Sequence, residues 1–100
     1  MRTASPALFA ESPKQNSMTQ ARIILYSKPG CHLCEVMKKE MASADCAELY
    51  ELEEINIESN AELFARYRHD IPVLMIDGVE AFRHRLTAVS FRDYLKKRAR

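Results

Sequence analysis

Cys31 and Cys34, separated by two residues, are the side chains of this chain best suited to do chemistry. They follow a short apolar run and Pro29-Gly30, which lets the backbone turn tightly, and they open a stretch with helical periodicity. The positive end of a helix favours thiolate over thiol, and Lys28 and His32 can bring further positive charge. The pattern therefore predicts that Cys31 is a nucleophile whose pKa lies below the usual thiol value of about 8.5.

Cys34 is predicted to be the second thiol of a redox pair. Residues three apart are neighbours on a helix, so its sulfur should face the same side as the sulfur of Cys31. We expect Cys34 to be more buried and to attack the mixed disulfide on Cys31, which releases the substrate. His32 and Leu33 lie between the cysteines, where they influence the couple and are candidate substrate-binding residues.

Two other interpretations of the cysteine pair stay open at this point. The pair could supply ligands to zinc or to an iron–sulfur cluster shared between two copies, or it could belong to the core of a binding module without catalysis. Zinc normally takes four ligands, and the remaining candidates Cys46, His69 and His84 follow no recurring spacing. The chain is therefore predicted to have no metal ligands and no tightly bound cofactor.

Composition and charge narrow the class of protein further. A length of 100 residues allows one domain, which we expect at residues 21–100 after a disordered tail at residues 1–20. A net charge of +1 gives no argument for nucleic acid or an anionic membrane, and no apolar run is long enough to span a bilayer. Three cysteines are an odd count, which favours a reducing compartment and hence the cytoplasm. We expect a monomer.

The elements that would position the pair can be read from periodicity. Residues 22–27 form an apolar run typical of a central strand, and residues 31–44 repeat apolar side chains, among them Val36, at helical spacing. Residues 52–57 alternate like a strand, and the spacing of Ser59 and Glu62 predicts a capping box for a second helix. The remaining expected elements are a strand at 72–76, a hairpin turn at Asp77-Gly78, a strand at 79–82 and a helix after Thr87.

This order, β-α-β-α-β-β-α, predicts an α/β fold. Strands joined through helices favour parallel pairing, and the hairpin adds an antiparallel strand. We therefore expect a four-stranded mixed sheet with helices on both faces.

Together, the segments Tyr26–Cys34, Asp70–Val73 and Ile76–Gly78 resemble a glutaredoxin, and most closely the glutaredoxin-like group with a Cys-x-Leu-Cys site. The resemblance covers roughly residues 22–97 and implies a thioredoxin-like fold of the glutaredoxin type. It also implies a cis peptide bond before Pro72, where the residues alone favour an ordinary trans bond. In this family Ile71 would offer backbone hydrogen bonds to the substrate, and Lys28 would meet a carboxylate of glutathione.

One segment departs from the family pattern. Typical dithiol glutaredoxins carry a glycine pair after the fourth strand that holds the γ-glutamyl end of glutathione, whereas this chain has no glycine beyond Gly78. Glutathione is therefore a candidate co-substrate, and either glutathione or a thioredoxin reductase is a candidate electron donor. The resemblance implies a thiol–disulfide oxidoreductase that reduces protein or low-molecular-weight disulfides and serves electron transport and cell redox homeostasis.

Overall fold

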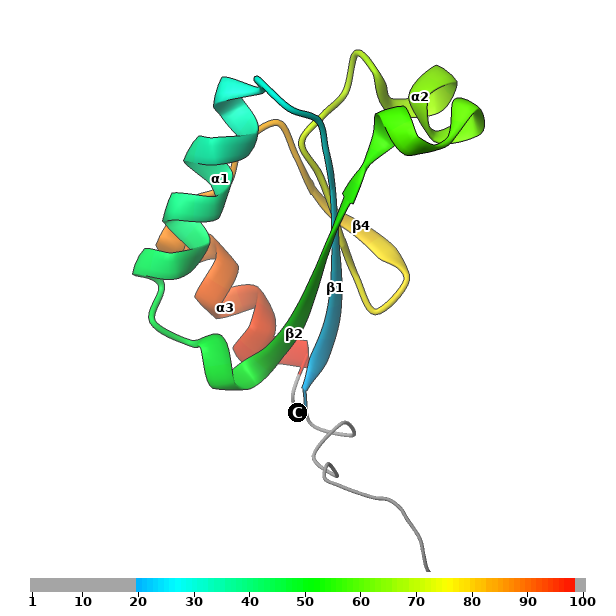
Figure 1. Ribbon diagram of the computed structural model, residues 1–100. Coiled ribbons are helices and arrows are strands. Elements are labelled where there is room, and N and C mark those ends of the chain that lie inside the picture. The colour runs from blue at the N-terminus through cyan, green and yellow to red at the C-terminus, as the bar shows by residue number, and fades with distance from the viewer. Residues whose placement is uncertain (1–19, 99–100) are drawn as a thin grey trace, which may run out of the picture.

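The computed structural model describes residues 20–98 (Figure 1). Apart from Gln20, the expected tail at residues 1–20 lies outside the described residues. Two short 3-10 helices are added to the predicted order of strands and helices. The elements are β1 (Ala21–Ser27), α1 (His32–Ser43), η2 (Ala47–Leu49), β2 (Tyr50–Asn56), η3 (Ile57–Ser59), α2 (Ala61–Tyr67), β3 (Val73–Ile76), β4 (Val79–Arg83) and α3 (Ala88–Arg98).

The four strands form one mixed sheet in the order β2-β1-β3-β4. β1 pairs in parallel with β2 and antiparallel with β3, and β3 pairs antiparallel with β4. In Figure 1, α1 and α3 cover one face of the sheet, while α2 lies on the other face near the carboxyl end of β1. The predicted four-stranded mixed sheet with helices on both faces is confirmed.

The buried apolar side chains form two hydrophobic clusters. The larger cluster lies between the sheet and helices α1 and α3, where Phe91 is fully buried and meets the ring of Tyr50 edge-on at 5.3 Å. The smaller cluster lies at the end of β1 beside α2 and includes Cys34, Ile71 and Val73. The cysteine pair is thus packed into the smaller cluster, at the end of the sheet.

Two local expectations were wrong. Val36 falls at a helical spacing but is 38% exposed, because it lies at the margin of the helix face that packs on the sheet. Asn60, and not Ser59, caps α2: the Asn60 side chain accepts hydrogen bonds from the N–H groups of Glu62 and Leu63 at 2.8 and 3.1 Å. Ser59 is unavailable because it ends η3, and its hydroxyl donates to the Asn56 carbonyl at 2.7 Å.

Candidate functional site

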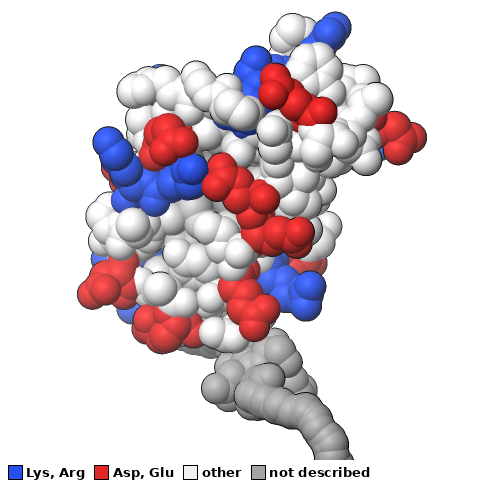
Figure 2. Space-filling model, in the orientation of Figure 1, with Lys and Arg blue, Asp and Glu red and all other residues white. Residues whose placement is uncertain are grey.

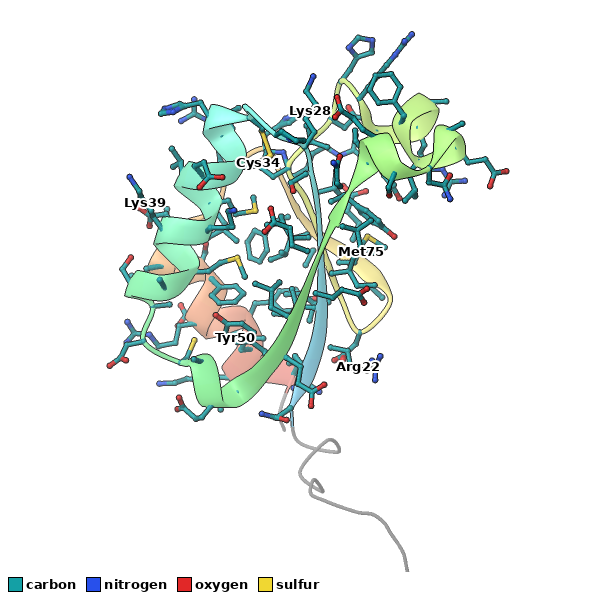
Figure 3. All side chains as sticks on the ribbon, in the orientation of Figure 1. Arg22, Lys28, Cys34, Lys39, Tyr50 and Met75 are labelled. Carbon is teal, nitrogen blue, oxygen red and sulfur yellow. A yellow bond between two sulfur atoms is a disulfide. The ribbon has the colours of Figure 1, made fainter. Side chains whose placement is uncertain are left out.

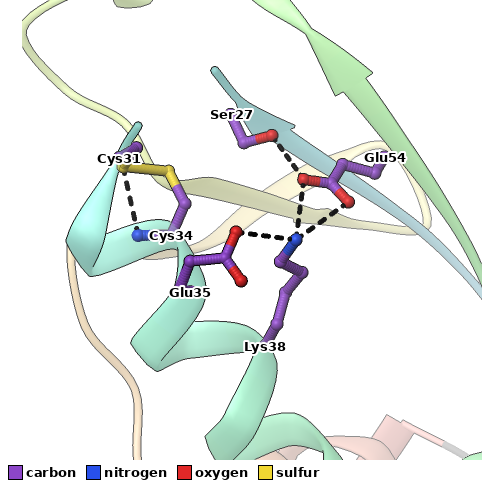
Figure 4. Close-up of a disulfide and its surroundings, with 6 residues drawn as sticks. All are labelled: Ser27, Cys31, Cys34, Glu35, Lys38 and Glu54. Atoms are coloured by element: carbon purple, nitrogen blue, oxygen red, sulfur yellow. Dashed lines mark hydrogen bonds and ion pairs between the residues drawn. A yellow bond between two sulfur atoms is a disulfide. The ribbon is translucent and has the colours of Figure 1, made fainter. Parts of the chain in front are cut away.

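Cys31 lies at the N-cap of α1, as predicted. Gly30 has a φ of +80°, a left-handed conformation that glycine adopts without strain, and this turn brings the chain from β1 into the helix. The Cys31 N–H donates to the Lys28 carbonyl at 3.3 Å. The Cys31 sulfur in turn accepts a hydrogen bond from the Cys34 N–H at 3.1 Å, so a helix N–H group points at this sulfur (Figure 4).

Cys31 and Cys34 are joined in a disulfide, with their Cα atoms 5.3 Å apart (Figure 4). The two residues differ in exposure, since Cys31 is half-buried while Cys34 is only 1% exposed. After reduction, a substrate disulfide can therefore reach Cys31 more easily than Cys34. The difference in exposure agrees with the prediction that Cys34 is the more buried of the two thiols.

A polar network lies beside the disulfide, and the sequence did not predict it. The buried Ser27 hydroxyl donates to the Glu54 carboxylate at 2.7 Å, and Lys38 donates to both oxygens of Glu54 at 3.2 and 3.3 Å (Figure 4). Lys38 also pairs with Glu35 at 3.1 Å. The network therefore ties α1 to the ends of β1 and β2 next to the cysteine pair. Ser27 and Lys38 lie 27 and 16 residues from Glu54 in the sequence, so the sequence gives no sign of these two contacts.

The pKa values within this network follow from its contacts. The hydrogen bond from Ser27, followed by the contact with Lys38, lowers the pKa of Glu54 despite partial burial. The hydrogen bond to Glu35, followed by that to Glu54, raises the pKa of Lys38. Both shifts favour the charged forms, so Glu54 and Lys38 form an ion pair at neutral pH.

Lys28 lies in a shallow pocket at the same end of the molecule as Cys34 (Figure 3). The pocket has a volume of about 290 Å³ and is bordered by charged and polar side chains from three elements and the turn between β1 and α1. Its lining residues are Ser27, Lys28, Pro29, Glu35, Glu54 and Asn56. Lys28 thus borders a polar recess between the turn and the ends of β1 and β2.

The loop before β3 brings Ile71 and Pro72 to the same end of the sheet. The peptide bond between them is cis, as the family resemblance implied. The Ile71 N–H donates to the carbonyl of Tyr67 at 3.1 Å, and the Pro72 carbonyl accepts from the His84 N–H at 2.7 Å. Ile71 packs in the same cluster as Cys34, so the structure joins these two parts of the predicted site.

The other predicted site residues border this cluster less closely. His32 is the first residue of α1 and is exposed, while Leu33 is half-buried. Tyr26 packs against the cluster and stacks on Tyr67, with ring centroids 4.7 Å apart. This stacking links β1 to the end of α2 within the cluster that contains Cys34.

Within residues 20–98, no group of three or more His, Cys, Asp or Glu side chains is placed to hold a metal ion. Cys46 is 3% exposed and belongs to the larger cluster, apart from Cys31 and Cys34. Burial is also the main cause that raises the pKa of the Cys46 thiol. Among the described residues, only Cys31 and Cys34 place two sulfur atoms side by side.

Comparison with known proteins shows the family. Residues 22–96 match the model of the glutaredoxin-like domain, DUF836. The chain belongs to the glutaredoxin-like family. A relative in Dictyostelium discoideum, the glutaredoxin-like protein YDR286C homolog, is 32% identical over 77 residues, which cover 71% of each chain.

Solved structures confirm the fold of this glutaredoxin-like chain. The X-ray structure of protein XcR50 from X. campestris has a TM-score of 0.65 at 24% identity and covers 75% of this chain and 96% of its own. A malaria parasite thioredoxin-2 has a TM-score of 0.59 at 15% identity, covering 78% and 82%. The predicted thioredoxin-like fold is therefore confirmed, and a close cysteine pair in this fold supports a redox role.

Across residues 20–98, each helix is too short or too polar to cross a bilayer.

Proposed function

We propose that this protein is a glutaredoxin-like thiol–disulfide oxidoreductase that reduces protein or low-molecular-weight disulfides. The observation that carries the proposal is the Cys31–Cys34 disulfide at the start of α1, with Cys31 at the N-cap and the more exposed of the two. The helix end and the Cys34 N–H stabilise negative charge on the Cys31 sulfur once the pair is reduced.

The reaction proceeds in two exchange steps. The Cys31 thiolate attacks one sulfur of the substrate disulfide, a Cys31–substrate disulfide forms, and the other substrate sulfur leaves as a thiolate that takes a proton from water. Cys34 then loses its proton and attacks the Cys31 sulfur, which expels the second substrate thiol. Two electrons pass to the substrate, and the product is the Cys31–Cys34 disulfide of Figure 4.

A thiol donor returns the two electrons and regenerates the dithiol. Glutathione is one candidate co-substrate, with Lys28 placed in the recess beside the pair to meet a carboxylate. A thioredoxin reductase is the other candidate donor. His32, Leu33, Ile71 and Pro72 would contact the substrate around Cys31. The odd number of cysteines favours a reducing compartment such as the cytoplasm, where we expect the protein to act as a monomer.

The proposal is tested by single replacements of the two cysteines. Cys31→Ser should abolish disulfide reduction, because the nucleophile is lost. Cys34→Ser should accumulate a mixed disulfide with the substrate, visible as a mass increase that a reductant removes. Cys46→Ser is the matched control and should keep full activity. Full turnover of a dithiol-dependent reaction by Cys31→Ser would refute the proposal.

The electron donor is identified with the same variants. Turnover of a glutathione mixed disulfide and of a protein disulfide is measured with glutathione and with a thioredoxin reductase system. Glutathione dependence should fall when Lys28 is replaced by methionine, if Lys28 holds the glutathione carboxylate. An absorption spectrum and metal analysis of anaerobically purified protein would reveal an iron–sulfur cluster, an outcome that would favour cluster binding instead.

A further inference from the structure

The loop that carries Ile71 and Pro72 is held from both sides. On one side, the N–H groups of Asp70 and Ile71 both donate to the Tyr67 carbonyl, at 2.8 and 3.1 Å. On the other side, the His84 N–H donates to the Pro72 carbonyl at 2.7 Å. The Ile71 N–H is thus already used, and a substrate backbone can bond here through the Ile71 carbonyl or by displacing the Tyr67 carbonyl.

Arg83, the last residue of β4, reaches this loop through its side chain. Its Nη1 atom lies 3.1 Å from Oδ1 of Asp70. Its Nε and Nη2 atoms each donate to one oxygen of Glu80 at 2.8 Å. This two-pronged contact fixes the plane of the guanidinium group, so that the remaining nitrogen points at Asp70.

The position of Asp70 gives this ion pair a role beyond surface charge. Arg83 and Asp70 are 40% and 32% exposed in their side chains, and such pairs contribute little to stability. Asp70, however, directly precedes Ile71, and the chain around Arg83 also provides the His84 N–H that binds Pro72. Displacement of Asp70 would therefore shift the backbone edge at Ile71 before it would unfold the domain.

We infer that Arg83 is a positioning residue that, through Asp70, holds the Ile71 backbone edge in place for the main chain of a peptide disulfide. This inference rests on the proposed oxidoreductase function. It concerns substrates with a peptide backbone beside the disulfide, since a small disulfide without one has nothing to bind at Ile71. The transfer of electrons itself remains with Cys31 and Cys34.

The test compares two substrates in single-turnover reactions of the reduced protein. One substrate is a short peptide dimerised through a cysteine, and the other is hydroxyethyl disulfide, which has no peptide groups. Arg83→Met should lower the second-order rate constant for the peptide disulfide by about threefold to fivefold. The rate constant for hydroxyethyl disulfide should stay unchanged, because Cys31 is untouched.

Two further variants separate positioning from charge. Asp70→Asn should reproduce the effect of Arg83→Met, and the double variant should add nothing to it, because the Arg83–Asp70 ion pair is the contact that both changes remove. Arg85→Met removes the same charge near the same strand end and should leave both rate constants unchanged. Thermal unfolding of each variant shows whether the domain remains folded.

The remaining outcomes refute either the positioning role of Arg83 or the proposed function. An unchanged peptide rate in Arg83→Met, with a normal wild type, would overturn the positioning role alone. An equal loss on both substrates would also overturn it, since it would indicate a general effect on the cysteine pair. Failure of the wild-type protein to react with either disulfide would overturn the proposed function, and the positioning role with it.

Discussion

Replacement of Glu54 with alanine should destabilise the domain by about 2 kcal/mol, because it leaves the buried Ser27 hydroxyl without its charged acceptor. A hydrogen bond to a charged group contributes about 1.5–3 kcal/mol to stability. The Lys38 pair adds only about 0.2–1 kcal/mol, since the Glu54 side chain is 40% exposed and water screens the pair. Most of the effect should therefore come from Ser27.

A double-mutant cycle isolates this contribution. Ser27→Ala removes the buried hydroxyl, so that in this background Glu54→Ala should cost only about 0.5 kcal/mol, the remainder from Lys38. The four oxidised proteins are compared by urea unfolding at neutral pH. An unchanged slope of the transition shows that a shifted midpoint reflects a change in stability. Equal costs of Glu54→Ala in both backgrounds would refute the assignment to Ser27.

The same carboxyl predicts a dependence of stability on pH. Its pKa is lower in the folded protein than in the unfolded chain, so the folded state binds this proton more weakly. The stabilisation is complete above the ordinary glutamate pKa of about 4.3 and is lost as pH falls toward the lower folded value. The difference in unfolding free energy between wild type and Glu54→Gln should therefore be constant near neutral pH and shrink in acid. A difference that grows on acidification would contradict this.

Three further predictions concern other parts of the fold. In the reduced protein, iodoacetamide should label Cys31 first and the buried Cys46 only after urea is added; early labelling of Cys46 would contradict its burial. Phe91→Ala should cost about 3–5 kcal/mol in urea unfolding, because the ring is fully buried. Replacement of His84 with glycine should raise the free energy of unfolding by about 0.5 kcal/mol. Glycine adopts the left-handed φ of +70° without strain, and this gain outweighs the added entropy of the unfolded chain. A lower urea midpoint would disprove this.

Much of this fold was predictable because its signals are local. The apolar run into β1, the turn at Asp77-Gly78 and the change from strand to helical periodicity at Cys31 each act within a few residues. Asp77 and Gly78 adopt the positive φ values that a tight hairpin requires. The N-cap position of Cys31 followed from the same kind of short-range information.

The parts that were missed depend on contacts between distant segments. Glu54 meets Ser27 and Lys38 only because β2 pairs in parallel with β1 and α1 packs beside both. Arg83 meets Asp70 only because β4 ends beside the loop before β3. The cap of α2 also depends on its neighbour η3. The Ser59 hydroxyl donates to the Asn56 carbonyl in this 3-10 helix, and Asn60 caps α2 instead.

The edge strand β2 has a consequence for how copies of this protein meet one another. Among the strands of residues 20–98 it pairs with β1 alone, and an open strand edge can recruit a second chain through its unpaired backbone groups. Acidic side chains gather along this strand on the molecular surface, with Glu51, Glu53 and Glu54 all exposed (Figure 2). Two such edges would bring like charges into register, so β2 resists edge-to-edge aggregation between copies of this protein.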